Sequence, residues 1–299
     1  MKRRNSLKIR GSDLTLMVVI YTFLLTCLLL MLYPLLYILS CSFSSPNAVV
    51  SARVWLFPVE PTLMGYIAVF KHPLIISGFA NSVFYTVFAT MINVILTIMA
   101  GYPLSRKGFV GRGIVMAIFV FTMFFSGGMI PSYLLVRNLG LYNTRWAILL
   151  SSAVSVTYII IARTFFKTTI PDELSEAAEM DGCNDLYFIL KVVLPLSGAI
   201  ISVISLFYAV DHWNSYFSAL LYIRDVKKFP LQIILRGILI ANDIDATSLT
   251  DVNAAADAQG LQQLLKYSLI VVACVPVMCI YPFIQKYFVK GIMIGSIKG

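Results

Sequence analysis

Six mostly apolar stretches run along the chain, and shorter polar segments separate them. Each is long enough to match the roughly 20 residues with which a helix crosses a bilayer. The stretches cover residues 14–40, 79–104, 114–134, 146–166, 192–220 and 265–288. The pattern therefore predicts an all-α integral membrane protein with six transmembrane helices.

Composition excludes a soluble fold. Hydrophobic residues make up 59% of the 299 residues and charged residues only 12%, whereas soluble domains carry about 25% charged residues. The net charge of +9 is typical of cytoplasmic loops in a membrane protein. No compact basic and aromatic patch accompanies it, so no nucleic-acid partner is expected.

The distribution of basic residues predicts the orientation. The apolar run from Leu14 to Cys41 is too long for a signal peptide and is expected to stay as the first helix. With the N-terminus inside, 14 of the 23 Lys and Arg residues lie on the cytoplasmic side. This bias predicts that both chain ends are cytoplasmic. Residues 41–78 and 223–263 then form outer loops, which either contact an extracellular partner or are solvated linkers.

Few residues offer catalytic or metal chemistry. The chain has five cysteines, without a CxxC pair, and only two histidines. No H-E-x-x-H motif and no nucleophile–base pair occurs, so we expect neither a metal site nor a membrane enzyme. Four cysteines lie within or at the ends of the apolar stretches and Cys183 lies in a polar loop, and all are interpreted as small apolar side chains rather than as a disulfide or metal site.

A polar segment between the fourth and fifth stretches, residues 167–195, contains a predicted short helix. Pro171 is expected at its first position, followed by the acids Asp172 and Glu173. Gly182 is expected to end the helix in a left-handed conformation. Asn184 or Asp185 then caps a second helix that leads into the fifth span, and Pro195 marks an elbow.

The two sides of this short helix differ in chemistry. Leu174, Ala177, Ala178 and Asp181 share one side, and Glu173, Glu176 and Met180 share the other. Small alanines allow close approach of another surface, and the acids match basic groups on it. This predicts a docking surface rather than a catalytic site.

The spacing of these residues resembles a known motif. Glu176-Ala177-Ala178, three residues, Gly182, nine residues and then Val192-Val193-Leu194-Pro195 is similar to the EAA loop of type I ABC importer permeases, with Val192 in place of isoleucine. The resemblance extends over nearly the whole chain and is to carbohydrate-uptake permeases. It includes the second permease of the maltose system and, more closely, Gram-positive oligosaccharide permeases of the lipoprotein-associated and rhamnogalacturonan types. The further segments that carry it are Ile130–Tyr133, Trp213–Phe217 and Phe288–Gly299.

The resemblance implies a type I ABC importer transmembrane fold in a bacterial cell membrane. Residues 1–76 would form the basic tail, the first transmembrane helix and an extracellular loop. Residues 77–288 would form the permease core with its coupling loop at 171–195, and 289–299 a cytoplasmic tail. The tail from about Lys286 would reach the ATPase interface, or would only anchor the chain by its basic end.

The resemblance also implies partners. Glu176, Ala177, Ala178, Gly182, Leu194 and Pro195 would couple this chain to a cytoplasmic ABC ATPase dimer. The chain lacks a phosphate-binding loop of its own, so ATP and Mg would bind the ATPase and no cofactor would bind here. A related second permease would complete a heterodimer. An extracellular binding protein with a lipid anchor would deliver the carbohydrate, and membrane lipid would surround the spans.

Contacts to a sugar are expected on the fifth span. Aromatic rings and amides suit sugars, and Tyr208, Trp213, Asn214 and Tyr216 cluster there. The same residue types also anchor helices at membrane interfaces, so both interpretations stay open. Residues 243–263 would correspond to the family's loop that enters the binding protein.

An ion-gradient-driven secondary transporter is the alternative. Such proteins bury an ionisable relay group in mid-membrane. Asp211 and His212 are expected near the outer end of the fifth span, and no acid is expected at a span centre. Uptake that survives ATP depletion would favour this alternative.

Overall fold

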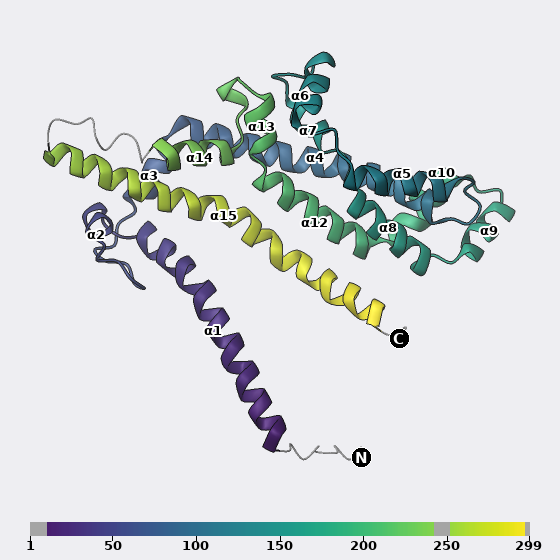
Figure 1. Ribbon diagram of the computed structural model, residues 1–299, viewed down its shortest axis with the longest axis horizontal. Helices are drawn as coiled ribbons and strands as arrows, with labels where there is room; N and C mark the ends of the chain where they lie inside the picture. The colour runs from purple at the N-terminus through teal and green to yellow at the C-terminus, as the bar shows by residue number, and fades with distance from the viewer. Residues whose placement is uncertain (1–10, 242–251, 297–299) are drawn as a thin grey trace. The chain divides into compact units, whose positions relative to one another are not determined.

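The computed structural model describes residues 11–241 and 252–296 (Figure 1), with side chains for 14–240 and 260–282. All regular elements in these ranges are helices. The chain separates into two compact units, Met1–Lys71 with Leu239–Val272, and His72–Ile238 with Ala273–Gly299. The all-α prediction is confirmed for the described residues, while the predicted division at residues 76 and 288 stays a prediction.

The first unit contains α1 (Gly11–Ser42), α2 (Pro46–Val50), α3 (Met64–Lys71) and the first part of α15 (Val252–Ser296). Cys41, Val49, Val54 and Leu264 form its small core. Gly65 lets α3 approach α15 closely, because a Cβ at this position would collide with the Ser268 hydroxyl and the Leu264 side chain. Close packing of this kind is typical of helices in membranes.

Backbone and serine hydrogen bonds order the segment after α1. Thr62 N donates to Phe43 O at 2.8 Å, and Ser40 Oγ donates to Leu56 O at 2.6 Å. The first predicted outer loop is therefore a folded segment with two short helices. In the second, residues 231–241 form α14 (Leu231–Ala241). Asp243, Asp245 and Asp251 lie outside the described residues, and the side chain of Asp257 is not described.

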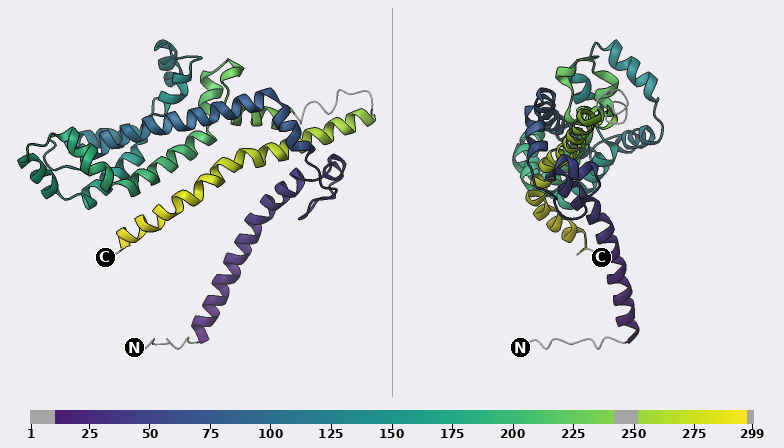
Figure 2. Two further views of the ribbon diagram at one scale, coloured as in Figure 1. Left: turned by 180° about the vertical axis from the view of Figure 1, so that it is seen from behind. Right: turned by 90° about the vertical axis from the view of Figure 1, so that its left-hand side faces the viewer.

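Three long helices of the second unit pack side by side: α4 (Pro73–Ser105), α8 (Val156–Thr169) and α12 (Gly198–Asn214) (Figures 1 and 2). Gly101 sets the contact between α4 and α8, since a Cβ there would lie only 3.1 Å from the Cβ of Ala162. The remaining helices before α12 are α5 (Arg112–Phe124), α6 (Met129–Asn138), α7 (Arg145–Ser151), α9 (Asp172–Met180), α10 (Asp185–Phe188) and α11 (Leu194–Leu196). After α12 come α13 (Phe217–Tyr222) and a short turn at Val226–Lys228.

Three predicted spans are bent rather than straight. The predicted span 114–134 consists of α5 and α6, which meet at 113°. The span 146–166 consists of α7 and α8 at 52°, and in the span 192–220 the segment Asp185–Leu196 meets α12 at 83°. Gly128, with a φ of 86°, permits the first bend because a side chain disfavours that conformation. The described residues hold three helices long and apolar enough to cross a membrane, or up to six if each bent pair is one span.

Asn143 joins two loops at the end of the second unit where α13 ends. Its φ of 59° is left-handed, a conformation that asparagine tolerates better than most residues. Its Oδ1 accepts hydrogen bonds from the backbone N–H groups of Arg224 and Asp225, both at 3.0 Å. Lys228 Nζ donates to the Asn143 carbonyl at 2.8 Å. One side chain thus fixes the start of the segment that leads to α14.

Candidate functional site

The short helix in the polar segment is α9, which runs from Asp172 to Met180. Pro171 is the N-cap residue, with φ −60° and ψ 148°, so the prediction of Pro171 at the first helical position is wrong by one residue. A proline ring fixes φ but leaves ψ free, and here ψ is extended. Asp172 and Glu173 lie in the first turn as predicted, where the helix dipole favours acids.

Gly182 ends α9 in a left-handed conformation, with a φ of 73°, which confirms the predicted turn. Cys183 N donates to Ala178 O at 2.9 Å, and Gly182 N donates to Glu179 O at 3.0 Å. This pair of bonds is the Schellman motif, which satisfies carbonyls at a helix end. The direction in which the chain leaves α9 is therefore fixed by the backbone.

The chain then enters the core through three short helical pieces. Asn184, one of the two predicted caps, accepts from Tyr187 N at 2.7 Å and so caps α10. A π-helical turn follows over Ile189–Val193, in which Leu194 N donates to Ile189 O. Pro195 lies in α11, and the 83° bend comes at Ser197. The elbow is thus two residues beyond the predicted position.

The exposed surface of α9 differs from the predicted faces. None of its nine residues is buried. Ala177 is exposed, whereas Ala178 packs against the core cluster of the second unit. The structure therefore distinguishes the two alanines, since Ala177 is exposed and Ala178 is partly covered by the core. The exposed side chains around it are Glu173, Leu174, Glu176, Glu179 and Met180.

Arg106 ties the start of α9 to the ends of α4 and α8. Its guanidinium donates to Phe166 O at 2.8 Å and to Ile170 O at 3.0 Å, and it contacts Asp172 Oδ1 at 3.2 Å. The side chain is only 13% exposed, and it also lies 5.1 Å from the ring centroid of Tyr102. A planar guanidinium suits this role because its donors point in several fixed directions. Sequence reasoning missed Arg106, which was counted only as a cytoplasmic charge.

The other end of the segment is held by apolar packing. Phe188 and Val193 are buried with Tyr102 of α4 and Phe166 of α8 in one cluster. The rings of Tyr102 and Phe166 meet edge to face at 5.8 Å. Burial of two large side chains provides several kcal/mol by area alone, on the order of 2 kcal/mol each. The exposed helix α9 is thus attached rigidly at both of its ends.

Two of the predicted sugar contacts lie inside the second unit. Tyr208 is 3% exposed, and its hydroxyl contacts Thr97 Oγ1 at 2.7 Å and accepts from Ser155 N at 3.1 Å. Trp213 is 4% exposed, and its Nε1 donates to Ala273 O at 2.9 Å. Both polar groups are therefore occupied by this chain.

The other two predicted contacts are exposed. Asn214 donates from Nδ2 to Val210 O of its own helix at 2.9 Å. Tyr216 is 41% exposed, and the Arg236 guanidinium lies 5.8 Å from its ring centroid. The structure thus does not bring the four predicted residues into one pocket, and their part in substrate binding stays a prediction.

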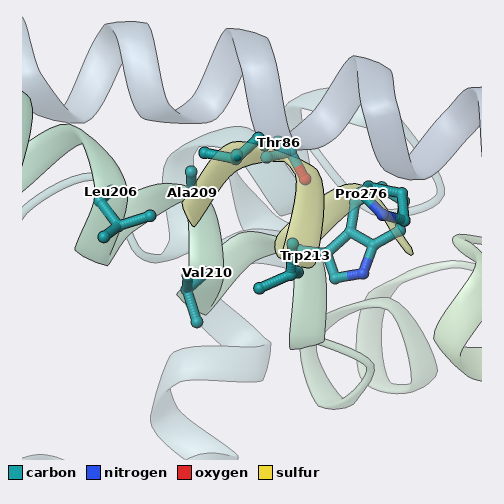
Figure 3. Close-up of a pocket in the computed structure, with 8 residues that line it drawn as sticks. Thr86, Leu206, Ala209, Val210, Trp213 and Pro276 are labelled. Atoms are coloured by element: carbon teal, nitrogen blue, oxygen red, sulfur yellow. The ribbon is translucent and has the colours of Figure 1, made fainter. Parts of the chain in front are cut away.

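A small cavity beside Trp213 is lined by side chains of α4, α12 and α15 (Figure 3). Its lining is apolar except for Thr86, whose buried hydroxyl has no hydrogen-bond partner among the described residues. Sugar binding needs several convergent polar groups. We therefore do not assign this cavity to a sugar.

Asp211 and His212 are among the last four residues of α12, which ends at Asn214. His212 Nε2 and Asn93 Nδ2 of α4 are 2.8 Å apart. Asp211 accepts from Tyr158 Oη of α8 at 2.9 Å. The expectation that both residues lie near the outer end of the fifth span stays a prediction.

Comparison with known proteins identifies the family. Residues 93–294 match the model of the binding-protein-dependent transport system inner membrane component. The chain is 41% identical over 280 residues to the polygalacturonan/rhamnogalacturonan transport system permease protein of Bacillus subtilis (strain 168), covering 94% of this chain and 97% of that protein. It is also 41% identical over 267 residues to Protein LplC of the same organism, covering 89% of each.

A solved structure matches the fold over almost the full chain. It comes from a bacterial ABC transporter involved in the import of the acidic polysaccharide alginate. The TM-score is 0.84 at 36% sequence identity, and the match covers 93% of this chain and 98% of the other. The protein therefore belongs to the family of binding-protein-dependent transport system inner membrane components, as a membrane-embedded ABC transporter permease, a transport subunit rather than an enzyme.

Proposed function

We propose that this chain is a permease subunit that moves an oligosaccharide into the cytoplasm, driven by ATP that a separate subunit hydrolyses. The observation that carries the proposal is α9, a helix without buried residues that is attached rigidly at both ends. ATP binding would close the ATPase dimer and displace α9. Its attachments would then pass this motion to α4, α8 and α12. Coupling of this kind requires that the inward-open and the outward-open states contact the ATPase differently.

The orientation follows from the basic residues. With six spans, three of them bent pairs, both termini and α9 face the cytoplasm. Arg106, Lys107 and Arg112 lie on the same side as α9, consistent with the ion pairs from Arg106 and Lys107 to Asp172 at 3.2 and 3.1 Å. The loop around Asn143 and Lys228 then faces outward.

The bend between α5 and α6 supports a second permease chain. Residues 121–132 are all exposed. The N–H groups of Ser126, Gly127 and Gly128 have no hydrogen-bond partner in the described residues. Non-helical backbone at membrane depth is tolerated only against protein or water. A related permease that covers this bend would form the heterodimer, with the route for the sugar between the two chains.

The remaining partners follow from the family. A binding protein outside the cell, with a lipid anchor, would load the sugar. An arabinooligosaccharide permease protein of Halalkalibacterium halodurans also matches, at 28% identity over 272 residues. Permeases for several different glycans are thus among the relatives, which supports an oligosaccharide as the cargo. ATP and Mg would bind only to the ATPase.

The test is co-purification of the ATPase through a tag on this chain. Ala177→Trp adds bulk to the exposed side of α9 without entering the core, so it should remove the ATPase from the complex. Ala177→Ser keeps a small side chain and should leave the complex intact. Unchanged co-purification of the Trp variant would refute docking at α9.

The exposed carboxylate of Asp211 on α12 keeps the ion-gradient alternative open to experiment. Reconstituted vesicles separate the two mechanisms. The proposed function requires that uptake stop without ATP and persist when the proton gradient is collapsed. The reverse result would identify a secondary transporter.

A further inference from the structure

The side of α12 that carries Asp211 combines an exposed carboxylate with the half-buried rings of Tyr158 and Phe207. Asp211 is exposed, although it lies on an apolar helix within the predicted fifth span. A carboxylate on a membrane-spanning helix avoids lipid and faces water or another polar group.

We propose that Asp211 and Tyr158 form a binding site for the hydroxyl groups of an uncharged sugar on its way through the membrane. The site rests on the proposed import function and deepens it. Tyr158 Oη donates to Asp211 Oδ2 at 2.9 Å. In the described residues Oδ1 has no donor, and an ionised carboxylate has about four acceptor positions. Sugar hydroxyls are donors of the matching kind.

Neighbouring groups extend the site along α12. Phe207 is one turn before Asp211, and its ring stacks on Tyr158 with centroids 5.7 Å apart at 22°. Asn214 is exposed one turn after Asp211, and in the described residues its Oδ1 accepts no hydrogen bond. The row from Phe207 to Asn214 spans about 10 Å, a length that suits a disaccharide unit. Aromatic faces match the C–H faces of sugar rings, and the acid and amide match hydroxyls.

A buried layer behind the row holds it in place. Tyr158 meets the ring of Tyr208 edge to face at 4.7 Å, and Tyr208 is fixed by Thr97 and Ser155. His212 contacts Asn93, whose Nδ2 also donates to Ser152 O at 3.0 Å. Tyr208 thus supports the site instead of contacting the sugar. Preorganised polar groups bind without a further ordering cost.

The charge of Asp211 also determines whether the site prefers neutral or acidic sugars. A uronate would bring a second carboxylate to the first, and such like-charge contacts discriminate strongly between ligands. The site therefore favours neutral oligosaccharides over polyuronates, in contrast to the acidic cargo named for the alginate importer. Two other roles compete with sugar binding for Asp211. It would pair with a cation of the second permease in the first, and it would relay protons in the second.

The experiment uses the whole complex in proteoliposomes with saturating binding protein. The probes are a neutral galacto-oligosaccharide and a galacturonate oligosaccharide of equal length, and both uptake and ATP hydrolysis are measured. Wild type should import the neutral probe faster. Asp211→Asn should lower neutral uptake about tenfold or more and Tyr158→Phe about threefold. Stimulation of ATP hydrolysis by loaded binding protein should stay within about twofold, because docking and coupling lie elsewhere. Asp225→Asn, an isosteric change in the outer loop, is the matched control.

Several outcomes overturn the site while leaving the import function intact. One is unchanged uptake by Asp211→Asn, and another is a wild-type preference for the uronate probe. A third is loss of the second permease from the purified Asp211→Asn complex, since that loss would identify an ion pair between the two permeases. Wild-type uptake that collapses with the proton gradient would identify a relay. Absence of any ATP-dependent sugar uptake by wild type would instead remove the proposed function and the site together.

Discussion

Two residues with left-handed backbone conformations hold the polar segments of the second unit. Asn143 combines its φ of 59° with side-chain bonds to two backbone N–H groups. Gly182 needs its φ of 73° for the turn after α9, and a Cβ there would meet no atom of the described part of the chain within 4 Å. The constraint at Gly182 is thus one of backbone conformation alone, whereas Asn143 adds specific hydrogen bonds.

Asn143→Ala should destabilise the protein by about 2 to 4 kcal/mol, because it removes two hydrogen bonds and places alanine in the left-handed region. Asn143→Gly removes the same bonds but accepts the backbone conformation, so it should cost about half as much. Thermal unfolding of the purified protein in detergent measures both. An Asn143→Ala protein that melts with wild type would contradict this view of the loop.

Gly182→Val should reduce sugar uptake per ATP hydrolysed, because a β-branched side chain resists the turn that directs the chain out of α9. The cost in the backbone is about 1 to 2 kcal/mol. Gly182→Asn, which tolerates the left-handed region, is the control and should keep most coupling. Uptake and hydrolysis measured together in vesicles decide the outcome, and a Val variant with the wild-type ratio would count against it.

At the scale of elements, one guanidinium connects α4, α8 and α9. Arg106 caps carbonyls at the end of α8 and pairs with Asp172 at the start of α9. Lys107, next in the chain, contacts the same aspartate, but its side chain is 80% exposed. Exposed ion pairs contribute little to stability, typically below about 1 kcal/mol. The two adjacent charges are thus a natural comparison.

Arg106→Ala should loosen α9 and lower the ratio of uptake to ATP hydrolysis several-fold, while Lys107→Ala should change it little. Arg106→Lys should restore only part of the coupling, since an ammonium lacks the planar set of donors. Co-purification of the ATPase checks that the complex still assembles. An equal ratio of uptake to hydrolysis in the two alanine variants would show that coupling depends on positive charge alone, and not on the hydrogen bonds that Arg106 makes.

Local signals predicted α9 well and tertiary features poorly. The acids of its first turn, the Gly182 turn and the Asn184 cap depend on near neighbours in sequence, so the pattern contained them. The bend at Gly128 escaped prediction because hydropathy averages over a break in helix direction, and the bend at Ser197 was predicted two residues too early, at Pro195. The packing of Ala178 against the core escaped for a related reason. It depends on which distant helices form the core around Phe166.

At the scale of the whole molecule, the proposed function depends on the side of the membrane that each loop faces. The α9 segment must face the ATPase, and the loop around Val226 must face the opposite side. Glu173 of α9 is exposed, and Val226 is 44% exposed. Both positions are therefore accessible to reagents.

Single cysteines test this topology in a variant whose five native cysteines are replaced. Glu173→Cys should react in whole cells only with a membrane-permeant maleimide, because the segment is cytoplasmic. Val226→Cys should also react with an impermeant one. Reaction of Glu173→Cys with the impermeant reagent would place α9 outside and would end the case for an ATPase partner.

The π-helical turn at Ile189–Val193 has a geometric consequence for the coupling segment. Phe188 and Val193 are five residues apart, and in an ordinary α-helix their side chains would point about 140° away from each other. The wider turn rotates them toward the same side, where both are buried. Removing one residue from this turn would break that angular register. The coupling segment would then lose its apolar attachment to the core, although the EAA motif itself stayed intact.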